Sequence, residues 1–225
     1  MAVIAFMMTI SASAQFYIYC SDGNIIKVDS ISMIAGHEYV DLGLSVKWAT
    51  CNVGASSPEE YGDYFAWGEV EPKEVYDWNT YKWCNGSEYS LTKYCTNSSY
   101  GTVDNKTTLE LSDDAARANW GGSWRMPTRE EQDELRQQCI WTWTTQNGVN
   151  GYKVTGTNGN SIFLPAAGYR DDSLFDYAGS LGYYWSSSLN TGNPGGAWYV
   201  YFVSDSVHRY SNERYCGFSV RPVCQ

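Results

Sequence analysis

Two histidines and several adjacent acidic pairs are the side chains of this sequence that could transfer protons near neutral pH. His37 stands beside Glu38, and His208 lies in the polar stretch VSDSVHRYSNERY. Catalysis needs such a group beside an orienting partner, and neither histidine falls in a nucleophile or metal motif. Sequence neighbours such as Glu130-Glu131 do not face each other on a helix, so they do not form the opposed carboxyls of a glycosidase. The sequence therefore predicts no catalytic residue and a protein that is not an enzyme.

Metal and cofactor motifs are missing from the sequence as well. C-x-x-C and paired Cys/His spacings do not occur, which removes the usual basis of a zinc site. Calcium takes about six to eight oxygen ligands, and the segment Gly192-Asn193-Pro194 has no acidic residue before its proline. Neither a P-loop nor a G-x-G-x-x-G followed by a helix is present, so nucleotide chemistry has no support. We expect no metal and no cofactor.

The seven cysteines leave at least one thiol unpaired unless a second chain supplies a partner. Cys84 and Cys95 bracket a polar loop, and Cys216 and Cys224 flank the last predicted strand. Both pairs are candidate disulfides. The sequence does not fix the connectivity.

The first fourteen residues have the character of a signal peptide. Residues 1–14 are uncharged and apolar and end in Ala12-Ser13-Ala14, which fits an A-x-A cleavage site. The alternative is an ordinary buried segment without the basic start of a typical signal. The stretch is too short to span a bilayer. We expect an exported protein, at the cell surface, extracellular or periplasmic, that does not insert into the membrane after cleavage.

The charge balance restricts the partners of the protein. The formal net charge of -10 opposes a broad phosphate-binding surface, so nucleic acid is not an expected partner. Aromatic residues reach 16%, with 19 Tyr and 10 Trp. So many amphipathic rings cannot all be buried with their polar ends satisfied, and some should line a surface.

Local signals predict an N-terminal hairpin and two helices. Phe16 to Val28 alternates apolar and polar residues around Asp22-Gly23, so we expect a hairpin within residues 15–35. Thr128 and Glu131 can form a capping box, which predicts a helix over residues 129–139. In LSDDAARANWG, Ser112 is the expected N-cap of a short second helix, and Gly121 suits the position after its end.

After Cys139 the pattern changes to period two, which predicts antiparallel strands. The segments are IWTWT, GYKVTGTNGNSIFLP with a turn at Asn158-Gly159, YYWSSS, AWYVYFV and FSVRPV. We therefore expect one α+β domain over residues 36–225, with helices before a mostly antiparallel C-terminal sheet.

Six segments occur in order between residues 39 and 223: YVDLGLSVKWATCNVGA (39–55), GDYFAWGE (62–69), WGGSWRMPTREE (120–131), LPAAGYR (164–170), YWSSS (184–188) and GFSVRPV (217–223). Together they resemble the Fibrobacter succinogenes major paralogous domain family, which is abundant in exported proteins of Bacteroidetes-type bacteria. The resemblance implies a C-type-lectin-like fold related to that of formylglycine-generating enzymes. Fold similarity does not decide function, and capping and packing explain the residue types of WRMPTREE and GFSVRPV.

The expected binding surface lies on the strand AWYVYFV. Alternation places Trp198, Val200 and Phe202 on one face and two tyrosines on the other. If the first face is core, the tyrosines point outward beside small polar residues, a mixture that is also common in antibody paratopes. The predicted ligand-binding residues are Asn190, Tyr199, Tyr201, Ser204, Ser206, His208, Tyr210 and Asn212. This C-terminal pattern is similar to that of variable proteins of diversity-generating retroelements, which implies a receptor that binds a glycan or protein at the cell exterior.

Two alternatives remain beside a secreted binding module. A formylglycine-generating-enzyme-like oxidase would need a reactive cysteine pair, and neither Cys216 nor Cys224 sits in a matching motif. A structural or adhesive subunit of a surface assembly would use the N-terminal hairpin to pair with the strand edge of a neighbour.

Overall fold

The computed structural model describes residues 16–19, 25–28 and 32–225. Strands β1 (Phe16–Tyr19) and β2 (Ile25–Val28) pair antiparallel, with Phe16 opposite Val28. The strands of the expected N-terminal hairpin therefore pair. The expected signal peptide, residues 1–14, and the turn Asp22-Gly23 lie outside the described residues.

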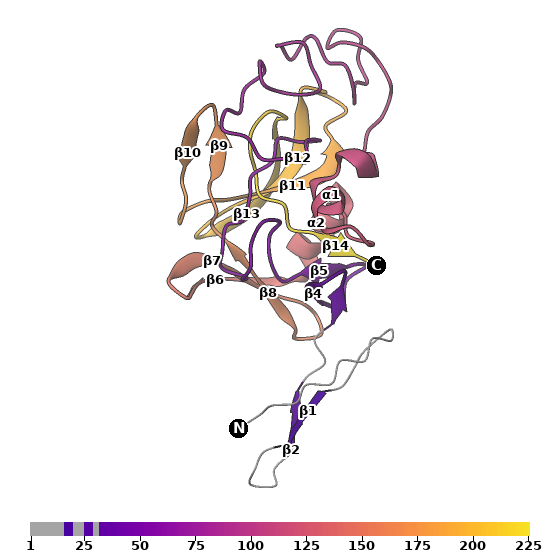
Figure 1. Ribbon diagram of the computed structural model, residues 1–225. Helices are drawn as coiled ribbons and strands as arrows, with labels where there is room; N and C mark the ends of the chain where they lie inside the picture. The colour runs from indigo at the N-terminus through magenta and orange to yellow at the C-terminus, as the bar shows by residue number, and fades with distance from the viewer. Residues whose placement is uncertain (1–15, 20–24, 29–31) are drawn as a thin grey trace.

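The described chain is a mixed α+β protein whose named strands all pair antiparallel (Figure 1). The main sheets have the orders β14-β5-β4-β3, β6-β7-β8 and β11-β12-β13, and β9 and β10 form a separate hairpin. The strand bounds are β3 Met33–Ile34, β4 His37–Val40, β5 Lys47–Ala49, β6 Ile140–Gln146, β7 Val149–Thr155, β8 Ser161–Pro165, β9 Tyr169–Asp171, β10 Leu174–Asp176, β11 Gly182–Leu189, β12 Gly196–Val203, β13 Ser206–Glu213 and β14 Val223–Cys224.

Helix α2 (Arg129–Gln138) begins where the sequence predicts. The Thr128 side chain accepts a hydrogen bond from the Glu131 amide, and the Glu131 side chain accepts one from the Thr128 amide. The complete capping box satisfies two amides that the first helical turn leaves unpaired. Arg125 also donates to both carboxylate oxygens of Glu131. These hydrogen bonds connect the segment before α2 with the first turn of the helix. No described helix has the length and apolar character needed to cross a membrane.

Helix α1 (Ala115–Trp120) starts later than expected, and Ser112 is not its cap. Residues Leu111–Asp113 form a single 3-10 turn, and Asp114 is the N-cap. One carboxylate oxygen of Asp114 accepts from the Arg117 amide at 3.0 Å and the other from the Met126 amide at 2.8 Å. Asp114 thus satisfies α1 and the incoming segment together, with one amide bound to each of its two carboxylate oxygens. Gly121 follows the helix as predicted and has a positive φ of 66°, but its ψ of -154° lies outside the left-handed helical region.

Residues 50–110 contain little regular structure and are held by the polar ends of buried aromatic rings. The Trp67 indole donates to the Ser186 carbonyl at 2.8 Å, and the Tyr81 hydroxyl donates to the Trp67 carbonyl at 2.6 Å. The Trp83 indole donates to the Gly68 carbonyl at 2.7 Å. Each ring fills the core and also satisfies a loop carbonyl, which is how a long loop avoids unpaired buried backbone groups.

Both faces of the β11-β12-β13 sheet carry buried residues. Val200 and Phe202 pack into one hydrophobic cluster with Tyr152 and Leu164, so the predicted inward orientation of these two residues is correct. A second cluster, which contains Trp185 and Phe218, covers part of the other face. Part of the sheet therefore has core on both faces, whereas β13 contains several exposed residues.

The last segment of the chain does not form the strand that FSVRPV predicts. Only Val223–Cys224 are a strand, and they pair with β5 rather than with the late sheets. Residues before them cross the core through single bridges, Phe65 with Phe218 and Tyr184 with Ser219. The alternation of residues in FSVRPV therefore reflects a buried segment that crosses the core, not a strand in a regular hydrogen-bonded ladder.

The expected disulfides are not present. Cys84, Cys95, Cys216 and Cys224 are free thiols. The Cys84 thiol lies against the carbonyl of Trp78, at 3.1 Å. Two cysteines that are close in sequence, or that flank a predicted strand, do not necessarily have their Cβ atoms at the separation that a disulfide requires.

Candidate functional site

Strand register gathers most of the predicted ligand-binding residues on one face of the β11-β12-β13 sheet. Residues directly opposite each other in an antiparallel pair share a face. Tyr199 lies opposite Tyr210, Tyr201 opposite His208, and Val203 opposite Ser206. With period two along each strand, the shared face carries Tyr199, Tyr201, Ser206, His208, Tyr210 and Asn212.

Two of the predicted residues lie apart from that face. Ser204 is exposed in the turn that joins β12 to β13. The Asn190 amide donates to the Ser211 hydroxyl at 2.9 Å. Since Ser211 pairs with Trp198, Asn190 contacts the opposite side of the sheet from Tyr201.

The expected exposure of Tyr199 is wrong. Its relative exposure is 6%, and its ring lies 4.9 Å from that of Phe218 and 5.8 Å from that of Trp185. The alternation along β12 is correct, but Phe218 from the last segment covers this part of the outward face. Trp198, expected in the core with Val200 and Phe202, is only half-buried, with Arg129 and Arg209 within 5.5 Å of its ring.

Beyond Tyr199 the aromatic rings continue to the surface as an unbroken series. Tyr177 stacks on Tyr169 with centroids 6.1 Å apart and 7° between the planes. Tyr169 contacts Tyr183 at 4.8 Å, and Tyr183 contacts Tyr201 at 5.1 Å. Tyr210 completes the series, at 5.9 Å from Tyr201 and 5.6 Å from His208. We call these six residues the aromatic platform: Tyr169, Tyr177, Tyr183, Tyr201, His208 and Tyr210.

The platform is exposed at its ends and anchored in the middle. Tyr177 is 59% and Tyr210 49% exposed, whereas Tyr183 packs on Phe218 at 5.0 Å. Rings that buried neighbours already hold in place lose little conformational entropy when a ligand stacks on them. Figure 1 shows the β9–β10 hairpin, whose ends carry Tyr169 and Tyr177, beside the sheet that supplies the other rings.

Burial, together with nearby carboxylates, raises the pKa of two phenols of the platform. Burial raises the pKa of Tyr169, and the charges of Asp171 and Asp176 raise it further. Burial, with Asp205 among the lesser causes, raises the pKa of Tyr201 in the same direction. The raised pKa keeps the phenols of Tyr169 and Tyr201 neutral, and a neutral phenol can both donate and accept hydrogen bonds.

The sequence could have suggested only part of the platform. Tyr183 lies opposite Tyr201 in the β11–β12 pairing, which the two period-two segments would predict once paired. Tyr169 and Tyr177 come from a different hairpin with a two-residue turn at Asp172-Ser173, where Asp172 has a φ of 50°. No local pattern shows that this hairpin packs against the sheet.

The candidate proton-transfer groups remain apart from one another. His37 stacks on Trp120 at 3.7 Å, and burial lowers the pKa of its imidazole. Burial raises the pKa of the Cys216 and Cys224 thiols, which disfavours the reactive thiolate. Within the described part of the chain, no cluster of three or more His, Cys, Asp or Glu side chains could hold a metal ion.

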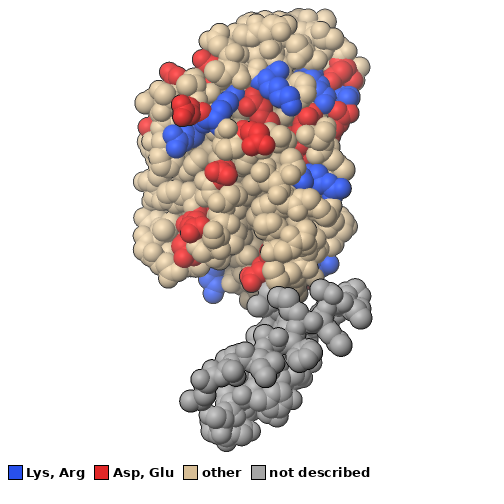
Figure 2. All heavy atoms as spheres, viewed as in Figure 1, with Lys and Arg blue, Asp and Glu red and all other residues tan. Residues whose placement is uncertain are grey.

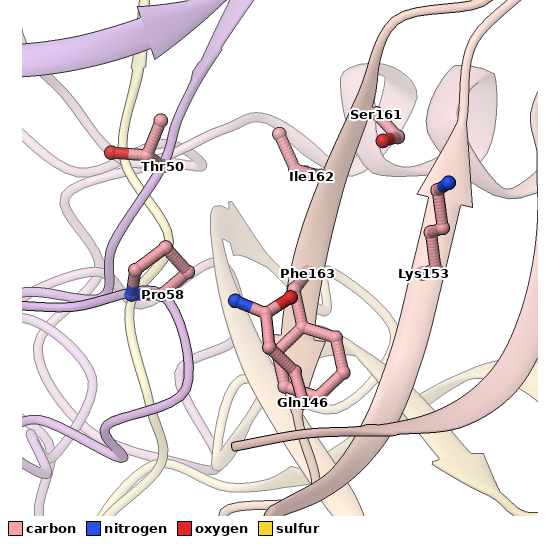
Figure 3. A pocket seen from close by; sticks show the side chains of 7 residues that line it. All are labelled: Thr50, Pro58, Gln146, Lys153, Ser161, Ile162 and Phe163. Atoms are coloured by element: carbon pink, nitrogen blue, oxygen red, sulfur yellow. The ribbon is translucent and has the colours of Figure 1, made fainter.

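A shallow hollow of about 350 Å³ lies between loop residues Thr50 and Pro58 and the β6-β7-β8 sheet (Figure 3). Gln146, Lys153 and Phe163 face it from the sheet. Its lining contains no carboxylate, no histidine and no cysteine. The hollow has the lining of a polar surface groove rather than of an active site.

One family model matches the chain. It is described as a domain of unknown function (DUF8237) and covers residues 126–223. The match runs from the approach to α2 through β14 and so includes every residue of the platform. No curated protein and no solved structure matches the chain at a significant level.

Proposed function

We propose that this chain is an exported ligand-binding protein with a C-type-lectin-like domain, which captures a glycan or protein ligand at the cell exterior on the aromatic platform. It acts by binding rather than by catalysis. The observation that carries the proposal is the series of contacting rings from buried Phe218 to exposed Tyr177 and Tyr210.

The fold assignment is supported by the architecture around the six family-like segments. Few helices, mostly antiparallel sheets and long ordered loops are what a lectin-like domain requires. The WRMPTREE segment forms the capped start of α2, and its Arg125 bridges Val223 of the last segment. The resemblance thus concerns residues that join distant parts of the chain, and such residues define a fold.

The binding assignment is supported by the chemistry of the platform. Flat neutral rings with polar ends offer large contact area at low entropic cost, as in binding loops. Aromatic surface of this kind stacks on sugar rings or on side chains of a protein. Ser206, the first residue of β13 and on the same face as Tyr201 and His208, can add an adaptable hydrogen bond.

The charge distribution supports an uncharged or cationic ligand rather than nucleic acid. Figure 2 shows basic side chains interspersed with acidic ones over the upper part of the molecule, without a continuous basic surface on this face. The net charge of -10 acts in the same direction.

Replacing Tyr177 and Tyr210 together by Ala tests the platform. The double variant should lose at least about tenfold in affinity, because truncated aromatic anchors in an interface commonly cost about 2 kcal/mol or more. Its melting temperature should stay within a few degrees of wild type, since both rings are about half-exposed. A glycan array together with a panel of purified extracellular proteins identifies the ligand, and titration then gives the affinity.

The matched control is Tyr89→Ala. Tyr89 is 64% exposed and contacts Tyr100 in a loop outside the platform. Equal loss of affinity in the control and in the double variant would contradict the assignment, as would full binding by the double variant.

An assembly subunit is the second candidate, favoured by two open strand edges. Strand β13 is the outer strand of its sheet, and the β1–β2 pair joins no other described strand. An eight-residue edge offers unpaired backbone groups to a strand from a neighbour. Deleting residues 15–28, which removes β1 and β2 and leaves β3 in place, separates the two functions. A pure binding module keeps its affinity and oligomeric state, whereas an assembly subunit loses higher oligomers in light scattering.

A further inference from the structure

A second hollow, of about 460 Å³, lies on the other side of the β9–β10 hairpin from the platform. Adjacent strand residues project to opposite faces, so Tyr169 points to the platform while Arg170 points away from it. The hollow falls within the volume range of small-ligand sites. Its charged and polar lining consists of Asp63, Tyr64, Lys73, Glu74, Arg170 and Ser173.

Aromatic rings position the Arg170 guanidinium, which has no polar partner among the described residues. Its guanidinium carbon lies 4.6 Å from the ring centroid of Phe175 and 5.6 Å from that of Tyr64. Phe175 is its partner across the hairpin. Among the described residues, no hydrogen bond or ion pair engages the Arg170 guanidinium, whereas buried Arg214 and Arg221 donate to backbone carbonyls. The N–H bonds of a guanidinium lie in its plane, so ring stacking leaves the donor edge free.

Of the three other charged side chains that line the hollow, one is already bound to groups of the protein and two are not. The Lys73 amine is bound to the Glu69 carboxylate at 3.0 Å and to the Thr80 carbonyl at 3.1 Å. Asp63 and Glu74 form no ion pair with described residues. Both residues are exposed, and the Asp63 carboxylate lies close to Gly54. A ligand would therefore meet one forked donor in the hollow and exposed carboxylate acceptors beside it.

We propose that this hollow binds a small ligand that carries a carboxylate together with neighbouring hydrogen-bond donors. The Arg170 fork receives the carboxylate in a bidentate pair, the geometry for which a guanidinium is suited. Asp63 and Glu74 receive the donors, which are an ammonium in an α-amino acid or hydroxyls in a uronic acid. This site is independent of the platform and of the function proposed for it.

The test is a titration of the full chain with L-serine and with D-glucuronate, followed by calorimetry or NMR. At least one of them should bind, whereas ethanolamine and D-glucose, which lack the carboxylate, should not. Arg170→Gln should weaken binding by about tenfold or more and Arg170→Lys by less, because the ammonium keeps the charge but not the fork. Arg117→Gln is the matched control, and the Tyr177/Tyr210 double variant should bind these ligands like wild type.

Glu74→Gln distinguishes the two ligand sources. It should weaken serine, whose ammonium loses a partner, and leave glucuronate unchanged or tighter, since one like charge is removed. If Arg170→Gln fails to fold, Ser173→Trp fills the hollow from its exposed rim and should abolish binding. Failure of both carboxylates to bind, or equal binding by wild type and a folded Arg170→Gln, overturns the proposal.

Discussion

Arg221→Met should lower the free energy of unfolding by about 3 kcal/mol or more, because buried acceptors left without a donor each cost about 1–3 kcal/mol. Arg221 is 1% exposed. It donates to the Asn52 side chain at 2.8 Å and to the backbone carbonyls of Ala49, Thr50 and Phe163 at 2.5 to 3.0 Å. One side chain thus joins the β5 end, the following loop and strand β8. Methionine keeps much of the volume and removes every donor.

Urea denaturation of Arg221→Met beside Arg117→Met measures this effect. Arg117 is half-buried, and its guanidinium has no ion pair with a described residue, so its substitution should change the free energy of unfolding by only about 0.5 kcal/mol. Similar losses in the two variants would show that the Arg221 hydrogen bonds do not hold these segments together.

Tyr199→Ala should destabilise the fold by about 3 kcal/mol, whereas the outward orientation predicted from alternation would make the change nearly neutral. The ring is buried against Phe218 and Trp185, and its removal leaves a cavity that the surrounding rings cannot close. For a domain of this size the melting temperature should fall by about 6–12 °C. Thermal denaturation followed by circular dichroism gives the value.

Tyr210→Ala is the control for Tyr199→Ala, because the two residues lie opposite each other on neighbouring strands. Tyr210 is 49% exposed, and its loss should shift the melting temperature by no more than about 2 °C. If the two variants have the same melting temperature, Tyr199 is not part of the core. The exposure of Tyr199 that alternation alone predicts would then be correct.

The sequence predicts local features of this fold well. The Thr128 capping box and the turn at Gly159, which has a φ of 86°, depend on residues a few positions apart. The faces of β12 follow from alternation, and Val200 and Phe202 are buried as expected. These features are determined by short-range sterics and hydrogen bonds, which a sequence displays directly.

The errors arise where distant segments meet. Alternation says which residues share a face but not what covers it, so the burial of Tyr199 depends on Phe218 arriving from the last segment. Asp114 replaces Ser112 as a cap because Met126 needs the same carboxylate. Tyr177 joined the candidate site only through the packing of its hairpin against the sheet.

The last segment of the chain crosses the interior of the domain, and this position also determines when the domain can fold. Phe218 and Arg221 lie in the interior, yet the ribosome adds them after nearly all the residues they contact. Until then Phe65 and Asn52 lack the partners that enclose them. A domain that folds as a unit can therefore close only when synthesis has passed Val223.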